Sequence, residues 1–196
     1  RPPPRPLTLG ELAERQLERA AAKRSIAHDR GRWAVILACL GRGRSVASIR
    51  STDVDILRAY ILSRPGRRRG SSGSSGSTGS TVNRYLALLS SALRIAIEDG
   101  VISSSPIARG HRMREQSRDR IATPAELEAV AGHADAETRL AITLALETCL
   151  RRGSIAALEW GAIDLAERVL TLPTSKSGQP IRVPLSRRAA AALEAW

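Results

Sequence analysis

The stretch LETCLRRGSIAALEW, from Leu146 to Trp160, places two adjacent arginines and a glycine in a run that otherwise has the composition of a buried helix. An unpaired buried charge is costly, so each arginine needs an anionic partner or an exposed position. A guanidinium at a helix start, beside a glycine that lets another backbone approach, suits two-pronged binding of a phosphate. The alternative is an ordinary ion pair between helices, with Glu147 or Glu159 as the acid. The residues alone leave both open.

A β-hairpin is predicted after this stretch. RVLTLP (168–173) and IRVPL (181–185) alternate like strands around TSKSGQ, with Gly178 in the turn. Only two of the 31 basic residues are lysine, and one of them, Lys176, falls at the hairpin tip. Lysine can give up a proton where arginine effectively cannot, so Lys176 is a candidate general acid beside an anion. The alternative is a chance position in a solvated turn.

Helices are predicted on both sides of the quoted stretch. TPAE, from Thr123 to Glu126, combines an N-cap, a proline at the first helical position and a glutamate at the third. Further helices are expected over about Ala136–Cys149 and about Gly153–Trp160, and Ser186 should cap a last alanine-rich helix. Residues 121–196 therefore combine helices with a small sheet.

The region before them shows four helices and no strand signal. Thr8 and the glutamate three residues later predict a capping box, and an apolar helix follows over Arg32–Gly41. A third helix should be capped by Ser51 or Thr52, and a fourth, long and amphipathic, should be closed by Gly100. The expected organisation is an extended leader (1–7), a helical domain (8–102) with a mobile Gly/Ser loop of natural or engineered origin (70–80), a linker (103–120) and a second domain (121–196).

Composition narrows the class of protein. The chain has 42% hydrophobic residues but only 3% aromatic ones and no Phe, so its core must consist of Ala, Leu, Ile and Val. Cys39 and Cys149 lie in apolar runs and are expected to be reduced core thiols of a cytoplasmic protein. No run of about 18 apolar residues predicts a membrane span.

Positive charge is concentrated in the first half of the chain. Residues 1–110 hold 18 Arg and 1 Lys against 8 acidic residues, whereas residues 111–196 hold 11 Arg and 1 Lys against 11. This asymmetry is typical of a polyanion-binding module joined to a nearly neutral one. An arginine-rich genome composition is the alternative, but it does not explain the asymmetry.

The order of these segments resembles the tyrosine recombinase, or phage integrase, family over about residues 8–196. The sequence TCLRRGSIAALEWGAID (148–164) is similar to the family's Thr-Gly-Leu-Arg-x-x-Glu, apolar helix and Trp-x-Asp-Ile-Asp. The sequence TSKSGQPIRVPL (174–185) is similar to its Thr-Lys-x-Gly and Val-Pro-Leu elements. The resemblance implies a helical core-binding (SAM-like) bundle followed by the first part of an α+β catalytic domain.

The resemblance also implies roles. Arg151 corresponds to the first catalytic arginine, which holds the scissile phosphate of duplex DNA, and Lys176 to the lysine that protonates the leaving 5′ oxygen. A tyrosine attacks the phosphodiester and forms a 3′-phosphotyrosyl link, without any cofactor or metal. Complete members act as tetramers on DNA, while we expect this chain alone to be a monomer. Expected DNA contacts lie at the start of the fourth helix and in the linker, at Thr81, Asn83, Arg84, Arg118 and Arg120.

Two departures from the family pattern bear on activity. Ser154 stands where the family has an acid three residues after the arginine, which puts local preorganisation in doubt. The region that carries the family's His-x-x-Arg and nucleophilic tyrosine has no counterpart after Lys176, so we expect an incomplete and inactive recombinase. HRMR (111–114) matches His-x-x-Arg formally but precedes Arg151, and Tyr60 and Tyr85 fall in the helical bundle.

Two other functions remain open. A DNA-binding regulator or decoy that keeps the fold without chemistry is favoured by Ser154. A basic helical protein bound to RNA is disfavoured by the scarcity of aromatic residues, which supply the stacking surfaces for unpaired bases.

Overall fold

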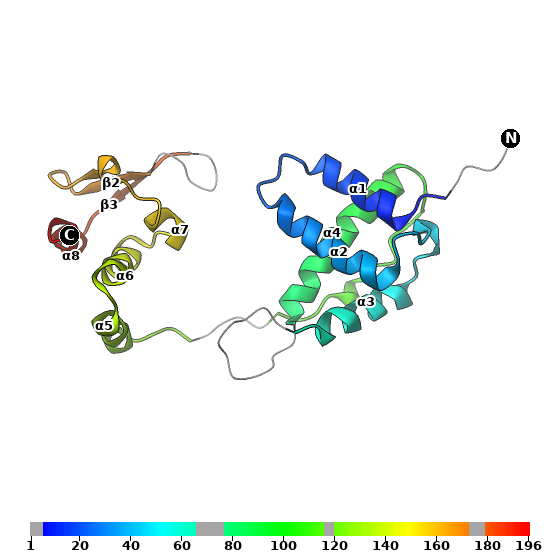
Figure 1. The fold of residues 1–196 in the computed structure, drawn as a ribbon, viewed down its shortest axis with the longest axis horizontal. Coiled ribbons are helices and arrows are strands. Elements are labelled where there is room, and N and C mark those ends of the chain that lie inside the picture. Colours follow the sequence, from blue (N-terminus) through cyan, green and yellow to red (C-terminus); the bar gives the residue numbers. More distant parts are fainter. Residues whose placement is uncertain (1–5, 66–76, 116–119, 173–178) are drawn as a thin grey trace. The chain divides into compact units, whose positions relative to one another are not determined.

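The computed structural model describes residues 6–65, 77–115, 120–172 and 179–196, and its chain divides into two compact units, Arg1–Ser117 and Arg118–Trp196 (Figure 1). The structure is mainly helical, with a three-stranded antiparallel sheet in the second unit, which confirms the expected fold class. Within the described ranges, no helix has the length and apolar character that a membrane crossing requires.

The first unit is a bundle of the four predicted helices: α1 (Leu9–Arg19), α2 (Ile26–Leu40), α3 (Ser51–Ser63) and α4 (Gly79–Glu98). The longest of them, α4, packs against the other three (Figure 1). Two short 3-10 helices, η1 (Val46–Ser48) and η2 (Arg109–His111), complete this unit.

The helix starts follow from their capping residues. Thr8 caps α1 as predicted: its hydroxyl accepts from the Glu11 N–H at 3.3 Å, and the Glu11 carboxylate accepts from the Thr8 N–H at 2.9 Å. The predicted cap of α3 is wrong. Arg50 is the N-cap, and the Asp53 carboxylate accepts its N–H at 2.8 Å, so the acid rather than a hydroxyl satisfies the first turn.

The second helix begins six residues earlier than predicted, at Ile26 instead of Arg32. Its polar first turn is stable because buried Asp29 pairs with Lys23 at 2.6 Å and with Arg32 at 2.7 Å. The residues of these ion pairs are charged and add nothing to an apolar helical period. The hydrophobic pattern of the sequence could therefore not reveal the first turn of α2.

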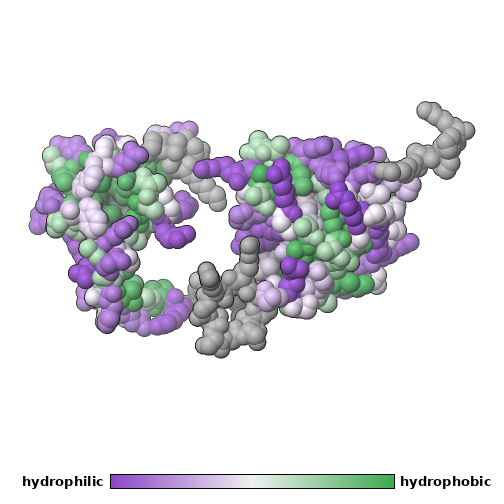
Figure 2. Space-filling model, in the orientation of Figure 1, coloured by the Kyte–Doolittle hydropathy of each residue, from purple (hydrophilic) through white to green (hydrophobic). Residues whose placement is uncertain are grey.

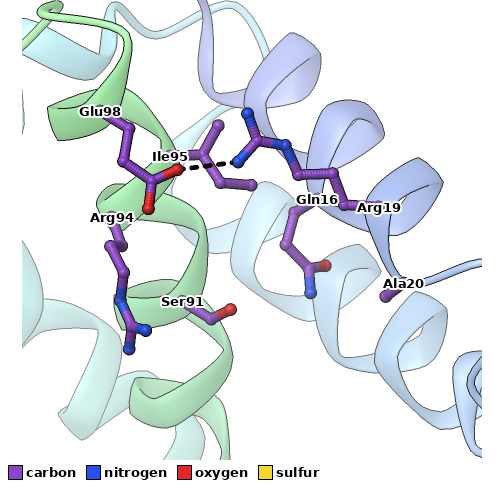
Figure 3. Close-up of a pocket in the computed structure, with 7 residues that line it drawn as sticks. All are labelled: Gln16, Arg19, Ala20, Ser91, Arg94, Ile95 and Glu98. Atoms are coloured by element: carbon purple, nitrogen blue, oxygen red, sulfur yellow. Dashed lines mark hydrogen bonds and ion pairs between the residues drawn. The ribbon is translucent and has the colours of Figure 1, made fainter.

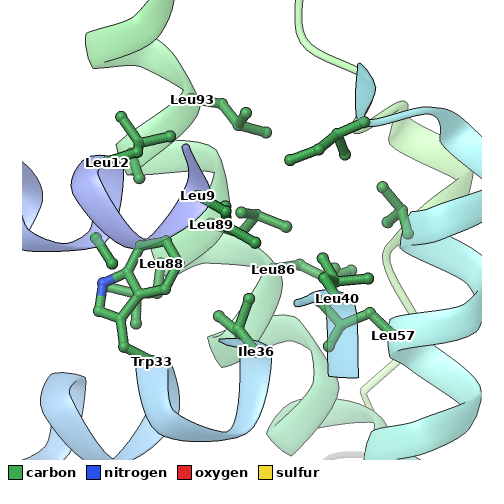
Figure 4. Close-up of a cluster of buried hydrophobic side chains, with 14 of the residues drawn as sticks. Leu9, Leu12, Trp33, Ile36, Leu40, Leu57, Leu86, Leu88, Leu89 and Leu93 are labelled. Atoms are coloured by element: carbon green, nitrogen blue, oxygen red, sulfur yellow. The ribbon is translucent and has the colours of Figure 1, made fainter. Parts of the chain in front are cut away.

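Leucine and isoleucine build the core of the first unit, with Trp33 as its largest member (Figure 4). The Trp33 indole N–H donates to the Gln16 side-chain oxygen at 2.9 Å, which removes the penalty of burying that donor. The aliphatic composition agrees with the prediction from a chain without Phe. Each fully buried side chain of this kind stabilises the bundle by roughly 1.5–3 kcal/mol.

The predicted linker (103–120) is only partly a linker, because residues 108–115 are held on the first unit. His111 is buried; its Nδ1 accepts the Ala108 N–H at 2.8 Å, and its Nε2 lies 3.0 Å from the Ser51 hydroxyl of α3. Asn83 of α4 accepts the Met113 N–H at 2.9 Å and donates to the Met113 carbonyl at 2.8 Å. Hydrogen bonds from polar side chains to a backbone produce no periodic pattern in the sequence. The charged, proline-containing segment was therefore predicted to be a solvated linker.

In its described residues, the second unit contains four helices and the sheet. The helices are α5 (Pro124–His133), α6 (Ala136–Thr148), α7 (Arg152–Ile155) and α8 (Arg187–Glu194), with a 3-10 turn η3 (Trp160–Ala162). The strands β1 (Ile163–Asp164), β2 (Val169–Leu172) and β3 (Ile181–Pro184) pair in that order, all antiparallel. The predicted hairpin strands are confirmed. The predicted capping box at Thr123 and the predicted N-cap at Ser186 are confirmed as well.

The helix predicted over Gly153–Trp160 is wrong in length, since α7 ends at Ile155. The chain turns there, with the Leu158 N–H bonded to the Ile155 carbonyl at 3.1 Å, and both side chains pack against the second core. That core is smaller than the first; its buried members are Leu144, Leu170, Leu172, Leu185, Ala189 and Leu193.

Candidate nucleic-acid interface

Arg151 occupies the N-cap position of α7, directly after the turn that ends α6. Its carbonyl accepts the N–H groups of Ser154 at 2.8 Å and Ile155 at 3.1 Å, so its backbone is fixed by the helix. Its side chain is exposed and forms no ion pair with any described residue, including Glu147 and Glu159. The alternative of an ordinary interhelical ion pair therefore does not hold in the described part of the chain, and the guanidinium is free to bind an anion from solvent.

The turn before Arg151 depends on a left-handed residue. Cys149, the C-cap of α6, has φ 54° and ψ 20°, and the neighbouring Leu150 enters the second core. The prediction that Cys149 is a core thiol is wrong, because its side chain is exposed, whereas Cys39 is half-buried against the first core. The apolar run around Cys149 covers the end of a helix, where the chain reverses and one side chain must point outward.

Glu147 is engaged elsewhere. Its carboxylate accepts the Ser186 hydroxyl at 2.6 Å and lies 3.8 Å from the Arg188 guanidinium. Because Ser186 also caps α8, this contact joins the end of α6 to the start of α8 and fixes the segment that leads into Arg151.

Lys176 lies outside the described residues. The strands that lead to it are described, and their last pair before the tip is Leu172 with Ile181. Convergence of Lys176 and Arg151 on one phosphate stays a prediction. Ser154, which stands in place of the family's acid, is half-buried, and its side chain makes no hydrogen bond with a described residue.

The three candidates at the start of α4 differ in their surroundings. Arg84 is exposed and makes no ion pair with a described residue, and the Thr81 hydroxyl lies 3.2 Å from that of Thr78. Both N–H groups of the Asn83 amide are used, one by the Met113 carbonyl and one by the Glu115 carboxylate, each at 2.8 Å. Asn83 therefore holds the chain in place, and its amide has no donor left for DNA in this arrangement.

Of the two linker candidates, Arg118 lies outside the described residues. Arg120 is exposed and pairs with Glu126 at the start of α5. The hydrogen bonds from the Thr123 backbone and from Arg120 lower the pKa of Glu126, so this acid stays ionised and remains a partner for Arg120.

The structure adds arginines that the sequence analysis missed. Many in the first unit pair with acids, such as Arg15 with Asp99 and Arg42 with Glu14. Others are exposed and form no ion pair or side-chain hydrogen bond with a described residue: Arg24, Arg30, Arg94, Arg109, Arg112 and Arg114. Figure 2 shows hydrophilic side chains over much of the drawn face of this unit. The sequence signal that could have revealed Arg94 is its helical spacing from Arg84 on the same helix.

The division into units sharpens the charge asymmetry. The first unit holds 21 basic and 9 acidic residues, and the second holds 10 of each, so the entire net charge of +12 belongs to the first. No group of three or more His, Cys, Asp or Glu side chains suited to a metal ion occurs among the residues that the structure describes.

Comparisons with known proteins agree with this architecture. Residues 111–196 match the model of the phage integrase family. The shufflon-specific DNA recombinase of Escherichia coli is 35% identical over 151 residues, which cover 74% of this chain and 38% of that protein. The chain spans about two fifths of the length of the curated relatives it matches.

Solved structures share the fold at low identity. The Tn1549 transposon integrase in complex with circular intermediate DNA has a TM-score of 0.75 at 16% identity, covering 96% of this chain and 64% of that one. A lambda integrase dimer bound to a COC′ core site has a TM-score of 0.75 at 19% identity, covering 96% and 69%. Through residues 111–196, which include Arg151 and the β-hairpin, this chain belongs to the phage integrase family.

Proposed function

We propose that this protein is a site-specific recombinase that binds duplex DNA and, as a whole protein, breaks and rejoins its strands. The observation that carries the proposal is an exposed Arg151, without an ion pair to any described residue, at the start of a helix in a phage integrase domain. A first unit with all of the net positive charge supplies the non-specific affinity for a polyanion. The similar integrases solved on DNA support the same polymer as partner.

The proposed chemistry divides between two side chains of the second unit. Arg151 binds the scissile phosphate and stabilises the charge that grows on its oxygens in the transition state, an effect worth roughly 2–4 kcal/mol per donor in comparable oxyanion sites. Lys176 gives a proton to the 5′ oxygen as it leaves. Both tyrosines of the chain, Tyr60 and Tyr85, belong to the first unit, so the attacking tyrosine is assigned to a part of the protein outside these residues.

A salt titration tests the DNA-binding proposal. Fluorescence anisotropy with labelled duplex DNA should give log K falling linearly with log salt concentration, by about 0.9 per phosphate contact. Arg151→Ala should lower that slope by about one contact. Arg139→Ala should leave it unchanged, because the charge that it removes from the same unit belongs to a guanidinium that already donates to the Ala131 and Ala134 carbonyls. A salt-independent affinity for duplex DNA, or equal preference for duplex RNA of the same sequence, would overturn the proposal.

A non-catalytic DNA-binding regulator is the second candidate, favoured by Ser154. Because Ser154 stands where the family has an acid, there is no carboxylate three residues after Arg151 to orient its guanidinium. The two functions separate on a nicked duplex that traps covalent intermediates: a DNA adduct formed by the whole protein supports recombination, and tight binding without any adduct supports the regulator.

We further propose that the whole protein assembles into a tetramer on DNA, as the lambda integrase solved on a Holliday junction does, while this chain alone is a monomer. Light scattering of the free chain should give the monomer mass of 21.1 kDa, and a stable tetramer would contradict this.

A further inference from the structure

Arg151 must be held by its backbone, because no described acid holds its side chain. Elsewhere in the chain an acid does this: Arg19 of α1 donates to Glu98 of α4 at 2.9 Å, and the dashed line in Figure 3 marks this ion pair. Arg151 has no such partner among the described residues, and Ser154 stands where the family pattern has an acid. The direction in which its guanidinium leaves the protein therefore depends on the residues that fix the main chain on either side.

The main chain is fixed by α7 after Arg151, whereas before Arg151 it has just reversed. The Arg151 carbonyl accepts the N–H groups of Ser154 and Ile155. The reversal occurs at Cys149, whose φ of 54° ends α6. The N–H of the next residue, half-buried Leu150, makes no hydrogen bond with a backbone carbonyl in the described part of the chain. Such an N–H needs another acceptor.

The Thr148 hydroxyl is that acceptor. It donates to the Leu144 carbonyl, one turn earlier in α6, at 2.5 Å, and accepts the Leu150 N–H at 3.4 Å. A hydroxyl has one donor and two acceptor positions, so both bonds form together. Leu144 is a buried member of the second core, so one hydroxyl ties the residue before Arg151 to that core across the turn. The second bond is longer than the usual range for N–H···O, so its effect should be modest.

A second threonine of α6 shows what is particular to Thr148. The Thr143 hydroxyl donates to the Arg139 carbonyl at 3.0 Å, which is the same bond to the residue four positions earlier. It accepts no hydrogen bond from a described residue. A bond of this kind is common for threonine inside helices and acts only within the helix. The bond that crosses the turn toward Arg151 distinguishes Thr148.

We propose that Thr148 is a positioning residue for Arg151: its hydroxyl holds the Leu150 N–H and thereby sets where the Arg151 guanidinium meets a phosphate. The inference rests on the proposed binding of phosphate by Arg151 and adds the residue that preorganises it. Thr148 acts through the main chain and itself contacts no substrate. A misplacement of about 1 Å in a reacting group can cost roughly a hundredfold in rate, so a bond to the preceding residue matters.

Two substitutions at position 148 separate the hydroxyl from the rest of the side chain. Thr148→Val keeps the shape and removes both hydrogen bonds, so it should weaken binding of the full chain to duplex DNA roughly three- to fivefold. Thr148→Ser keeps the hydroxyl and should bind as the wild type does. The matched control is Thr143→Val, which removes only the bond within the helix and should also leave binding unchanged. Fluorescence anisotropy at a fixed salt concentration measures all four proteins.

A double-mutant cycle shows whether Thr148 acts through Arg151. In the Arg151→Ala background, Thr148→Val should cause no further loss of affinity, because the group that it positions is gone. An equal loss in both backgrounds would show that Thr148 only stabilises the fold, and would overturn the positioning role. Wild-type affinity of Thr148→Val, or weak binding of Thr148→Ser, would overturn it as well.

A measurement on the unmodified chain tests the inference without relying on the folding of Thr148→Val. The Leu150 amide should exchange with deuterium at least roughly tenfold more slowly than in an unfolded peptide, because it is hydrogen-bonded. Exchange at the rate of the unfolded peptide overturns this inference and leaves the proposed function intact. A chain that does not bind duplex DNA, or whose binding does not respond to Arg151→Ala, overturns the proposed role of Arg151 and this inference together.

Discussion

Cys149 shows how one backbone angle sets up the candidate site. The residue adopts φ 54° at the end of α6, and this reversal directs Leu150 into the core and Arg151 outward to the start of α7. Left-handed angles cost a residue with a Cβ about 1–2 kcal/mol, and glycine avoids that cost. The family pattern has glycine at this place, which the backbone geometry explains.

Replacing Cys149 by glycine should therefore stabilise the second unit. We expect Cys149→Gly to raise the free energy of unfolding by roughly 0.5–1 kcal/mol, because the relief of strain exceeds the added freedom of the unfolded chain. Urea denaturation followed by circular dichroism measures the change. Cys149→Ala, which keeps the Cβ, should be neutral; an equal gain from alanine would show that the thiol, not the angle, is responsible.

The two thiols should differ in reactivity. Burial raises the pKa of the Cys39 thiol, so less thiolate is present near neutral pH, while Cys149 is exposed. An alkylating reagent at pH 7.5 should modify Cys149 first in the folded chain, as mass spectrometry of peptides will show. Equal rates in the folded protein, or faster labelling of Cys39, would contradict the described burial.

Among the elements, those with side-chain caps were the most predictable from sequence. The predicted N-caps of α1, α5 and α8 are confirmed at Thr8, Thr123 and Ser186. A cap is a local interaction between residues no more than three positions apart, so the sequence shows it directly. The early end of α7 and the two-residue β1 were not predictable, since both depend on contacts with the second core and not on a sequence period. The role of Arg151 rests on its motif and stays a prediction. The sequence could not show that Glu147 accepts the Ser186 hydroxyl and lies near Arg188 instead of pairing with Arg151.

The contact between α6 and α8 should be measurable as a coupling. Ser186 caps α8 by accepting the Ala189 N–H at 3.1 Å and donates to Glu147 at 2.6 Å. Ser186→Ala should cost about 1–2 kcal/mol, and a double-mutant cycle with Glu147→Ala should give a coupling of about 1 kcal/mol. Ser154→Ala serves as the control and should change stability by less than about 0.5 kcal/mol. Strict additivity of the two changes would show that the elements are held by apolar packing alone.

For the whole molecule, the charge asymmetry predicted two parts, and the division after Ser117 falls inside the predicted linker (103–120), although residues 108–115 of that linker are held on the first unit. The charge asymmetry along the chain is a sum over many residues, so a wrong prediction for one helix or loop does not change it. The attachment of residues 108–115 depends on a few directional hydrogen bonds that a hydrophobic pattern does not encode. Asn83 accepts the Met113 N–H, His111 accepts the Ala108 N–H, and the His111 Nε2 lies 3.0 Å from the Ser51 hydroxyl. Gly79 shows how close this packing is: a Cβ there would lie 3.1 Å from that of Met113.

The boundary can be tested by the stability of the first unit in two lengths. Residues 1–117 should unfold with a free energy roughly 2–4 kcal/mol higher than residues 1–102, because the shorter chain loses the hydrogen bonds of residues 108–115 and leaves Asn83 without its backbone partner. Asn83→Ala should lower the stability of the longer chain by about 2 kcal/mol and should have little effect in the shorter one. Thr81→Ala, two residues away and outside this contact, is the control in both lengths. Equal stability of the two lengths, or an equal effect of Asn83→Ala in both, would show that residues 103–115 are a solvated connection after all.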